Sequence, residues 1–331
     1  MSAIDFAKIQ KQMRAEAAAR RKARAADLSS GAPSATPPSD PTKGRQPKAE
    51  AGADAAPGPR MGPLAARAVE LEQHRCPCRA PTAPRDIFYI PDFVDKDAEA
   101  ALVASVAADA QPWVQLRERR LQCHGGTVLP EGTVAEPIPA HLRRVCTALH
   151  GSGIFTDTHP PNHVLVNEYS PGEGIMPHRD GPLYHPSVAI LSLRAPIAFD
   201  FWPSAAAASD PDADPAASLL LEPRSLLVFR GDAYTDFHHA IAQRAVDALR
   251  EERLVNWGAL SEGVRREGGE LDRSTRLSLT VRHVLNICTR SPAGADGAEP
   301  EPAPQGEREL EVQEEEKEVV VAAEAEPEPG S

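Results

Sequence analysis

Short runs of apolar residues, separated by turn residues, dominate the middle of the chain. Most of these runs have the length of a single β-strand and lie between Gly, Pro, Asn or Asp residues. The Pro-Gly-Glu-Gly sequence at 171–174 and the Gly-Asp pair at 231–232 are typical turn sequences. The pattern predicts strands at 87–93, 163–169, 187–193, 196–202, 218–229 and 275–284.

Two segments show the pattern of helices instead. Asp95 is suited to cap the N-terminus of an alanine-rich helix that ends near Ala110. Apolar residues recur at helical spacing through 141–150, which predicts a second helix with Cys146 in the core rather than at a metal site.

From residue 163 onward the predicted elements are almost all strands. Short strands with turns between them favour an antiparallel sandwich or barrel, with the helices packed outside. The predicted fold class is therefore mainly β (α+β). A charged stretch from about 247 to 272 interrupts the strand pattern and is predicted to be a surface insertion.

Both ends of the chain differ in composition from the middle. Residues 1–26 carry Lys and Arg among alanines, with a short apolar stripe. They are predicted to form a basic amphipathic helix, which is either an arm that binds a partner or a marginal solvated helix. Residues 27–84 are rich in Ala, Pro, Ser and Gly without periodicity, so they cannot bury enough apolar surface to fold. We therefore predict a disordered N-terminal region at 1–84, a folded domain at 85–290 and a disordered acidic tail at 291–331.

Composition restricts the cellular setting. The chain has five cysteines and a formal net charge of -12. A small, odd number of cysteines indicates free thiols in a reducing compartment. His74, Cys76 and Cys78 are close in sequence, but no second pair follows at zinc-finger spacing, so we expect a flexible, solvent-facing tract without a metal. No apolar run reaches about 18 residues, and we expect a soluble, intracellular monomer that does not bind membranes.

A candidate metal clip follows the strand and turn that begin at Asn167. His178 and Asp180 are two residues apart, so in extended backbone both side chains leave the same face. Two His and one carboxylate on one side of Fe(II) leave coordination positions open for oxygen chemistry. A His-x-Asp pair alone is also compatible with a hairpin tip that carries solvated polar groups.

The third ligand is expected at His239. Three or four strands separate it from Asp180, and a barrel would return the chain to the clip at this point. His238 is the competing candidate. We favour His239 because it begins an apolar strand entry, which would direct its imidazole inward and that of His238 outward.

The strand at 275–284 has one polar, cationic face. Arg276, Ser278, Thr280 and Arg282 alternate with apolar residues, so their side chains share that face. Two buried arginines are costly unless anions meet them, and a dicarboxylate such as 2-oxoglutarate is such an anion. Structural ion pairs with buried aspartates are the alternative.

Taken in order, these motifs resemble those of the AlkB-type Fe(II)/2-oxoglutarate-dependent dioxygenases. They are Asn-x-Tyr, His-x-Asp, a distal His and an Arg-x5-Arg strand. Over about residues 85–287 the chain looks most like the sixth AlkB homologue subfamily, through the segments 162–167, 172–178 and 180–184. The resemblance departs at His124, where the subfamily has an aromatic residue, and at the longer link that precedes Arg276.

The resemblance implies a double-stranded β-helix, or jelly-roll, core with flanking helices and long disordered termini. It also implies Fe(II) as cofactor and 2-oxoglutarate as co-substrate, in a protein of the nucleus and cytoplasm. The iron ligands would be His178, Asp180 and His239. The co-substrate would be held by Asn167, Tyr169 and Arg276, with Ser278 and Arg282 as further contacts.

The implied reaction couples the oxidation of 2-oxoglutarate to succinate and CO2 with hydroxylation of a C–H bond, and a hydroxylated N-methyl group is lost as formaldehyde. The expected function is oxidative demethylation of alkylated DNA or RNA, with Arg117, Arg119, Arg120 and the basic arm at 1–26 as phosphate contacts. Two alternatives stay open: an oxygenase that acts on a protein or small molecule, and a non-catalytic metal-bound module.

Overall fold

The computed structural model describes residues 68–128, 133–210 and 212–288. All of them fall within one compact unit, which ends at Thr289. The predicted basic helix at 1–26 and the predicted acidic tail at 291–331 lie outside the described residues.

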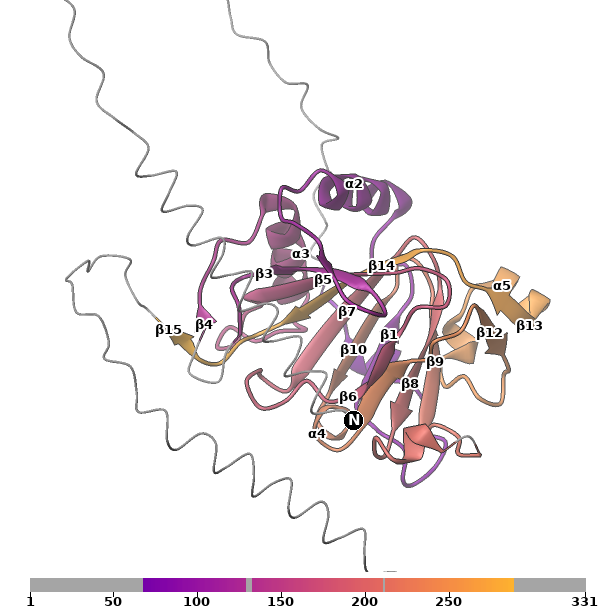
Figure 1. Ribbon diagram of the computed structural model, residues 1–331. Helices are drawn as coiled ribbons and strands as arrows, with labels where there is room; N and C mark the ends of the chain where they lie inside the picture. The colour runs from indigo at the N-terminus through magenta and orange to yellow at the C-terminus, as the bar shows by residue number, and fades with distance from the viewer. Residues whose placement is uncertain (1–67, 129–132, 211, 289–331) are drawn as a thin grey trace, which may run out of the picture. The chain divides into compact units, whose positions relative to one another are not determined.

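Two antiparallel sheets form the framework (Figure 1). The seven-stranded sheet has the order β1-β10-β7-β14-β5-β3-β2, and the four-stranded sheet has the order β6-β11-β8-β9. In the larger sheet the strands are β1 Ile87–Ile90, β2 Val114–Gln115, β3 Arg120–His124, β5 His163–Tyr169, β7 Ser187–Leu193, β10 Leu226–Arg230 and β14 Arg276–Arg282; in the smaller sheet they are β6 Ile175–His178, β8 Ile197–Trp202, β9 Ala217–Leu221 and β11 His238–Ile241.

The chain passes back and forth between the two sheets. From β5 onward, β5, β7, β10 and β14 enter the larger sheet, while β6, β8, β9 and β11 enter the smaller one. This alternation is the topology of a double-stranded β-helix. The predicted mainly β, jelly-roll fold is therefore confirmed.

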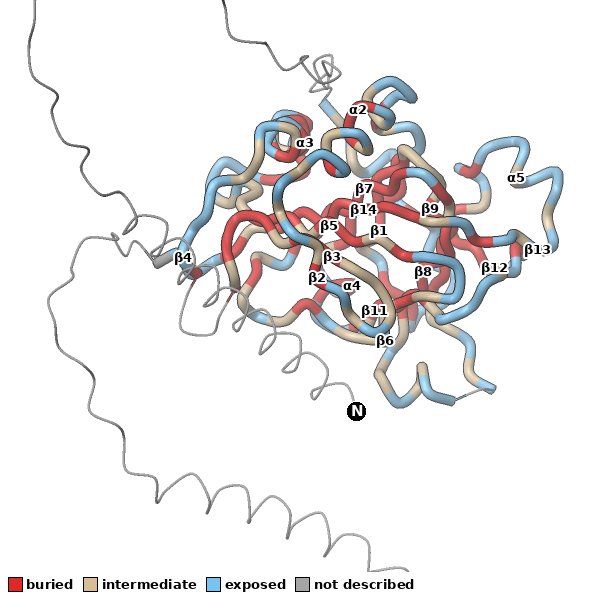
Figure 2. Tube along the Cα trace, turned by 45° about the horizontal axis from the view of Figure 1, so that its top comes forward, coloured by how far each residue is buried: buried red, intermediate tan, exposed pale blue. Residues whose placement is uncertain are grey.

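Each face of the larger sheet packs against a different hydrophobic layer. Residues such as Val188, Ile190 and Phe229 point toward the smaller sheet. Their neighbours in the alternating pattern, such as Ala189 and Leu191, point toward the helices. Both strand faces are thus buried, and Figure 2 shows the buried residues concentrated in the two sheets.

Two helices cover the outer face of the larger sheet (Figure 1). Helix α2, Lys96–Ala107, begins at Asp95, whose side chain accepts a hydrogen bond from the backbone N–H of Ala98. Helix α3, Ala140–Gly151, buries Cys146 as predicted. The remaining short elements are η1 Leu71–His74, β4 Thr133–Val134, η2 Ala207–Ser209, α4 Asp232–Thr235, β12 Val246–Leu249, η3 Trp257–Ala259, α5 Glu262–Glu267, β13 Gly269–Asp272 and β15 Ile287–Cys288.

The single strand predicted at 218–229 is wrong. The chain forms β9 in the smaller sheet and then β10 in the larger sheet, with a turn at 222–225 between them. Pro223 lacks a backbone N–H group, and Arg224 adopts a φ of 69°. Neither feature suits a strand interior, so the turn carries the chain from one sheet to the other.

The charged stretch at 247–272 is only partly a surface insertion. Its ends pair as the β12–β13 hairpin, but Asp247 is fully buried, and Leu254, Val255 and Leu260 join the core between the sheets. The prediction considered the many charged residues of the segment and overlooked these apolar positions. The prediction is therefore wrong for the buried part of the segment.

The segment before β1 is also more ordered than expected. The backbone N–H of Cys76 donates to the carbonyl of Ile87 at 2.9 Å, and the Cys76 side chain is buried. The predicted solvent-facing tract is therefore wrong for Cys76, although Cys78 is exposed. The expectation of free thiols is confirmed for Cys76, Cys78 and Cys146. Among the described residues, no helix has the length and apolar character needed to cross a membrane.

Candidate active site

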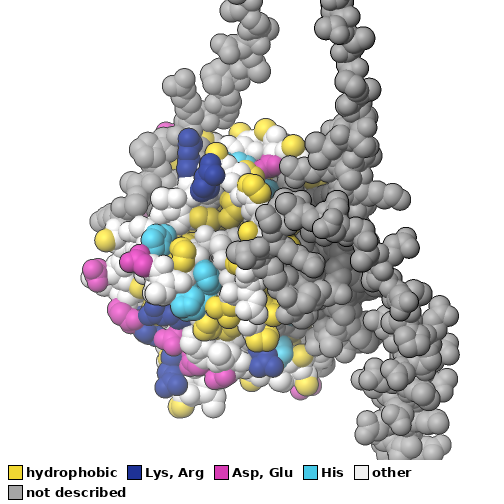
Figure 3. Space-filling view, turned by 90° about the vertical axis from the view of Figure 1, so that its left-hand side faces the viewer, with side chains coloured by type: hydrophobic (Ala, Val, Ile, Leu, Met, Phe, Trp, Pro, Cys, Tyr) yellow, Lys and Arg dark blue, Asp and Glu magenta, His cyan; other side chains and the backbone are white. Residues whose placement is uncertain are grey.

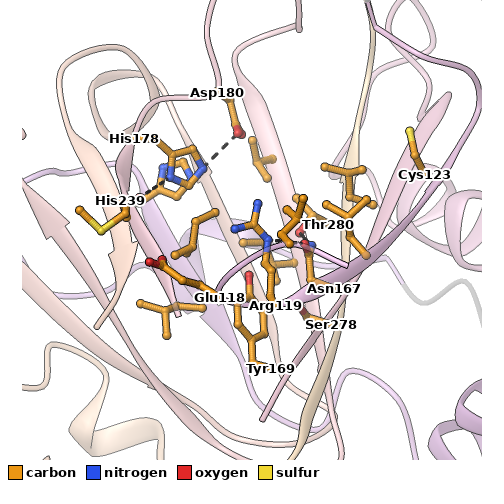
Figure 4. A pocket seen from close by; sticks show the side chains of 18 of the residues that line it. Glu118, Arg119, Cys123, Asn167, Tyr169, His178, Asp180, His239, Ser278 and Thr280 are labelled. Atoms are coloured by element: carbon orange, nitrogen blue, oxygen red, sulfur yellow. Dashed lines mark hydrogen bonds and ion pairs between the residues drawn. The ribbon is translucent and has the colours of Figure 1, made fainter. Parts of the chain in front are cut away.

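Strand pairing brings the candidate metal ligands together. His178 ends β6, and His239 lies directly opposite it on β11. Asp180 follows two residues after His178, beyond the end of the strand. The smaller sheet therefore holds the two imidazoles side by side, and the short link places the carboxylate next to them (Figure 4).

The three side chains are close enough to share one ion. One ligand atom from each lies within 4.8 Å of the other two. His239 Nε2 is 4.0 Å from Asp180 Oδ1, and the rings of His178 and His239 are 4.3 Å apart between centroids. The predicted convergence is found, with His239 rather than His238 as the third member.

The protonation states suit metal binding. Burial lowers the pKa of His239 to about 3 and also lowers the pKa of His178, so both imidazoles are neutral at physiological pH. His178 Nδ1 lies 2.9 Å from the carbonyl oxygen of Met176, which leaves Nε2 as the available ligand atom. Two neutral imidazoles and a carboxylate form a donor set that fits Fe(II).

Arg282 fixes the carboxylate of the triad. Its Nε and Nη2 atoms donate to the two oxygens of Asp180 at 2.9 and 2.6 Å. Burial, the largest single effect, would raise the pKa of Asp180, but the charge and hydrogen bonds of Arg282, together with His239 and His178, outweigh it and the pKa is lowered. Arg282 thus keeps Asp180 ionised and oriented. Its further role as a co-substrate contact stays a prediction.

Arg276 is a buried cation with only neutral partners. Its side chain donates to the hydroxyls of Ser278 and Ser192 at 3.1 and 2.9 Å, and Nε has no hydrogen-bond partner among the described residues. Burial lowers its pKa to about 10. The alternative of a structural ion pair with a buried aspartate holds for Arg282 but not for Arg276. A carboxylate ligand would supply the missing negative charge.

Asn167 and Tyr169 lie on the same face of β5, across the pocket from the triad (Figure 4). Asn167 donates to Thr280 Oγ1 at 3.4 Å, and its Oδ1 accepts a hydrogen bond from Arg119 Nε at 3.2 Å. The Tyr169 ring lies 5.7 Å from the Arg276 guanidinium. The predicted co-substrate residues therefore line one wall together.

A cavity of about 380 Å³ connects the triad to this wall. Its size fits a small ligand with several polar contacts. Sequence reasoning did not single out Glu118, Cys123 or His163 as part of it. Alternation along β5 could have indicated His163, which shares its face with Asn167 and Tyr169, but the β2–β3 hairpin gives no comparable signal.

The buried His163 is expected to make the folded protein less stable in acid. Its imidazole is buried, with Nε2 at 3.3 Å from Cys123 Sγ and no hydrogen-bond partner at Nδ1 among the described residues. Burial, and then the charge of Arg282, lower its pKa to about 3. As pH falls below the unfolded-state value of about 6.5, the unfolded chain takes up the proton first, so stability falls by up to about 1.4 kcal/mol per pH unit.

Urea unfolding of metal-free protein at pH 7, 6 and 5 checks this expectation. The free energy of unfolding should fall more steeply with decreasing pH in the wild type than in His163→Gln, which has no titrating group at that position. Equal slopes for the two proteins would contradict it.

Comparison with known proteins agrees with this geometry. Residues 116–282 match the model of the 2OG-Fe(II) oxygenase superfamily. A zebrafish (Danio rerio) protein named "Probable RNA/DNA demethylase ALKBH6" is 40% identical over 234 residues, which cover 69% of this chain and 96% of that protein.

Two further similarities are more distant. The Xenopus tropicalis protein named "tRNA (carboxymethyluridine(34)-5-O)-methyltransferase alkbh8" is 27% identical over 216 residues, which cover 62% of this chain and 32% of that protein. The solved structure of OsALKBH1 aligns with a TM-score of 0.40 and 18% identity, covering 62% of this chain and 100% of that one. The family match and the zebrafish relative together show that the chain belongs to the 2OG-Fe(II) oxygenase superfamily, as an AlkB-like member.

Proposed function

We propose that the protein is an Fe(II)- and 2-oxoglutarate-dependent dioxygenase that demethylates alkylated nucleic acid by oxidation. The observation that carries the catalytic part is the His178–Asp180–His239 triad, which shares a cavity with the unneutralised guanidinium of Arg276. A metal site beside a buried cation is suited to a dicarboxylate that also binds metal. 2-Oxoglutarate is such a molecule.

Each part of the cavity has a distinct task in this proposal. The triad would hold the iron, which together with 2-oxoglutarate supplies the oxidation of a C–H bond by O2. Arg276 would bind the distal carboxylate, with Ser278 orienting the guanidinium through their 3.1 Å hydrogen bond. Arg282 keeps the triad carboxylate ionised, and Asn167 and Tyr169 would position the co-substrate against the wall.

The nucleic-acid part of the proposal rests on two observations. The zebrafish relative is named as a probable RNA/DNA demethylase. Arg117 is an exposed cation at the rim of the cavity, next to Arg119. The positive charge of Arg120 is less available to a phosphate, because Glu168 pairs with it at 2.6 Å.

Other surface features keep a second substrate class open. Figure 3 shows a face on which Lys and Arg side chains are dispersed among Asp and Glu, with histidines gathered near its centre. The described part of this face therefore has no continuous basic stripe of the kind that follows a phosphate backbone. A protein or small-molecule substrate is the alternative that this surface favours.

Product analysis with the full-length chain tests the proposal. Protein supplied with Fe(II), 2-oxoglutarate and a panel of N-methylated DNA and RNA oligonucleotides is expected to form succinate and formaldehyde in step with loss of the methyl group. Oligonucleotide binding should weaken as salt rises, because phosphate contacts release counterions. Succinate formation that no oligonucleotide stimulates would favour the protein or small-molecule substrate. No succinate at all, with metal bound, would indicate a non-catalytic module.

A further inference from the structure

Arg119 reaches into the cavity from the turn between β2 and β3. Its side chain is half-buried, and it lies between the triad and the wall formed by β5 (Figure 4). Its Nε atom donates to Asn167 Oδ1 at 3.2 Å. The guanidinium therefore occupies the middle of the cavity rather than its outer rim.

The backbone of this turn is tied to the metal-bearing strand. The N–H of Leu116 donates to the carbonyl of Arg119 at 2.9 Å, which closes the turn. The N–H of Gly174, just before β6, donates to the carbonyl of Glu118 at 3.1 Å. These bonds hold the backbone at Arg119 in a fixed position relative to the strand that carries His178.

The arginines in and near the cavity differ in whether a carboxylate neutralises their charge. Arg120 pairs with Glu168, and Arg282 pairs with Asp180. Among the described residues, neither Arg119 nor Arg276 has a carboxylate within ion-pair distance; their recorded partners are an amide oxygen and two hydroxyls. The cavity therefore contains two inward guanidinium groups that lack an anion.

The position of Arg119 relates it to the metal and to the co-substrate wall at once. The guanidinium of Arg119 lies between the triad and β5, in the cavity that both line (Figure 4). The same guanidinium binds Asn167, one of the proposed co-substrate residues. Arg117, by contrast, is exposed at the rim, where it is better placed to contact a macromolecular substrate.

We propose that Arg119 is a second cationic contact for the co-substrate and couples co-substrate binding to the β2–β3 hairpin. Arg276 would then face the dianion from β14, and Arg119 would face it from the turn between β2 and β3. The hydrogen bond to Asn167 is exchanged for a charge-assisted bond to a carboxylate, which is the stronger interaction. This inference rests on the proposed function, because it requires that 2-oxoglutarate binds in this cavity.

Binding of 2-oxoglutarate in the absence of turnover provides the test. Full-length protein with Zn(II) in place of Fe(II) is titrated with 2-oxoglutarate by isothermal titration calorimetry. Arg119→Gln is expected to weaken binding by about tenfold, as for loss of a hydrogen bond between charged groups. Arg119→Lys, which keeps the charge but not the planar fork, should lose less. Arg265→Gln, at an exposed position on α5 that does not line the cavity, is the matched control and should bind 2-oxoglutarate within about twofold of the wild type, a difference too small to represent a lost ionic contact.

The outcomes separate this inference from the proposed function. Arg276→Gln serves as the positive control, and thermal unfolding verifies that each variant is folded. Unchanged affinity in Arg119→Gln, while Arg276→Gln binds weakly, would overturn the role of Arg119 and leave the proposed function intact. Tighter binding in Arg119→Gln would also overturn it, because the guanidinium would then merely block the site. Absence of saturable binding in the wild type would remove the proposed function and the inference together.

Discussion

Replacing His178 with alanine is expected to abolish 2-oxoglutarate turnover while leaving the fold in place. The substitution removes one of three ligands from a site that must also keep positions open for ligands from solution. We expect succinate formation to fall by more than about a hundredfold, since even loss of a group that only orients a ligand costs 10–100-fold. The His178 side chain is partly exposed at a strand end, so truncation creates little cavity in the core.

His238→Ala is the matched control for this experiment. His238 immediately precedes His239 on β11 but is not a member of the triad, so this variant should keep metal and turnover. Asp180→Ala is a poorer choice, because it also leaves Arg282 buried without its partner and so weakens the fold. Succinate formation by His178→Ala at a rate near that of the wild type would contradict the assignment of the triad.

Replacing Asp247 with alanine is expected to lower the free energy of unfolding by about 3–5 kcal/mol, the usual cost of breaking a buried ion pair from one side. The Asp247 carboxylate is fully buried and accepts hydrogen bonds from Arg273 Nε and Nη2, both at 2.7 Å. It also accepts from Arg244 and from the backbone N–H of Ala198. Without it, the buried Arg273 guanidinium has no counter-charge.

Urea unfolding of single and double variants measures this effect. Asp247→Leu combined with Arg273→Met should be more stable than Asp247→Ala alone, because no charge is left buried without a partner. Glu262→Gln, which removes an exposed ion pair with Arg266 on α5, is the surface control and should change stability by less than about 1 kcal/mol. A loss below about 1 kcal/mol in Asp247→Ala would show that the buried pair does not stabilise the fold.

The buried Asp247–Arg273 pair is also connected to the strands that carry the candidate metal ligands. Arg273 Nη1 donates to the carbonyl of Ala242, just after β11, at 2.7 Å and to that of Glu173, just before β6, at 3.3 Å. The buried pair therefore joins the ends of the two strands that present His178 and His239. The segment that sequence alone assigned to a surface insertion thus supports the candidate metal site.

The sequence by itself determined the parts of this protein that depend on local periodicity. Alternation along 275–284 assigned Arg276, Ser278, Thr280 and Arg282 to one face, and the structure has them on the cavity side of β14. The spacing of His178 and Asp180 likewise indicated a shared direction. These inferences succeed because a strand fixes the direction of each side chain within two residues.

Only the tertiary structure decided which of these groups meet. The pairing of Arg282 with Asp180, the contact of Arg119 with Asn167 and the burial of Asp247 against Arg273 each join residues that are far apart in the chain. Periodicity gives the direction of a side chain but not its partner, because the partner depends on which strands the two sheets place next to each other. The strand order of the double-stranded β-helix thus gave Arg282 a carboxylate within the cavity, whereas Arg276 and Arg119 have none among the described residues.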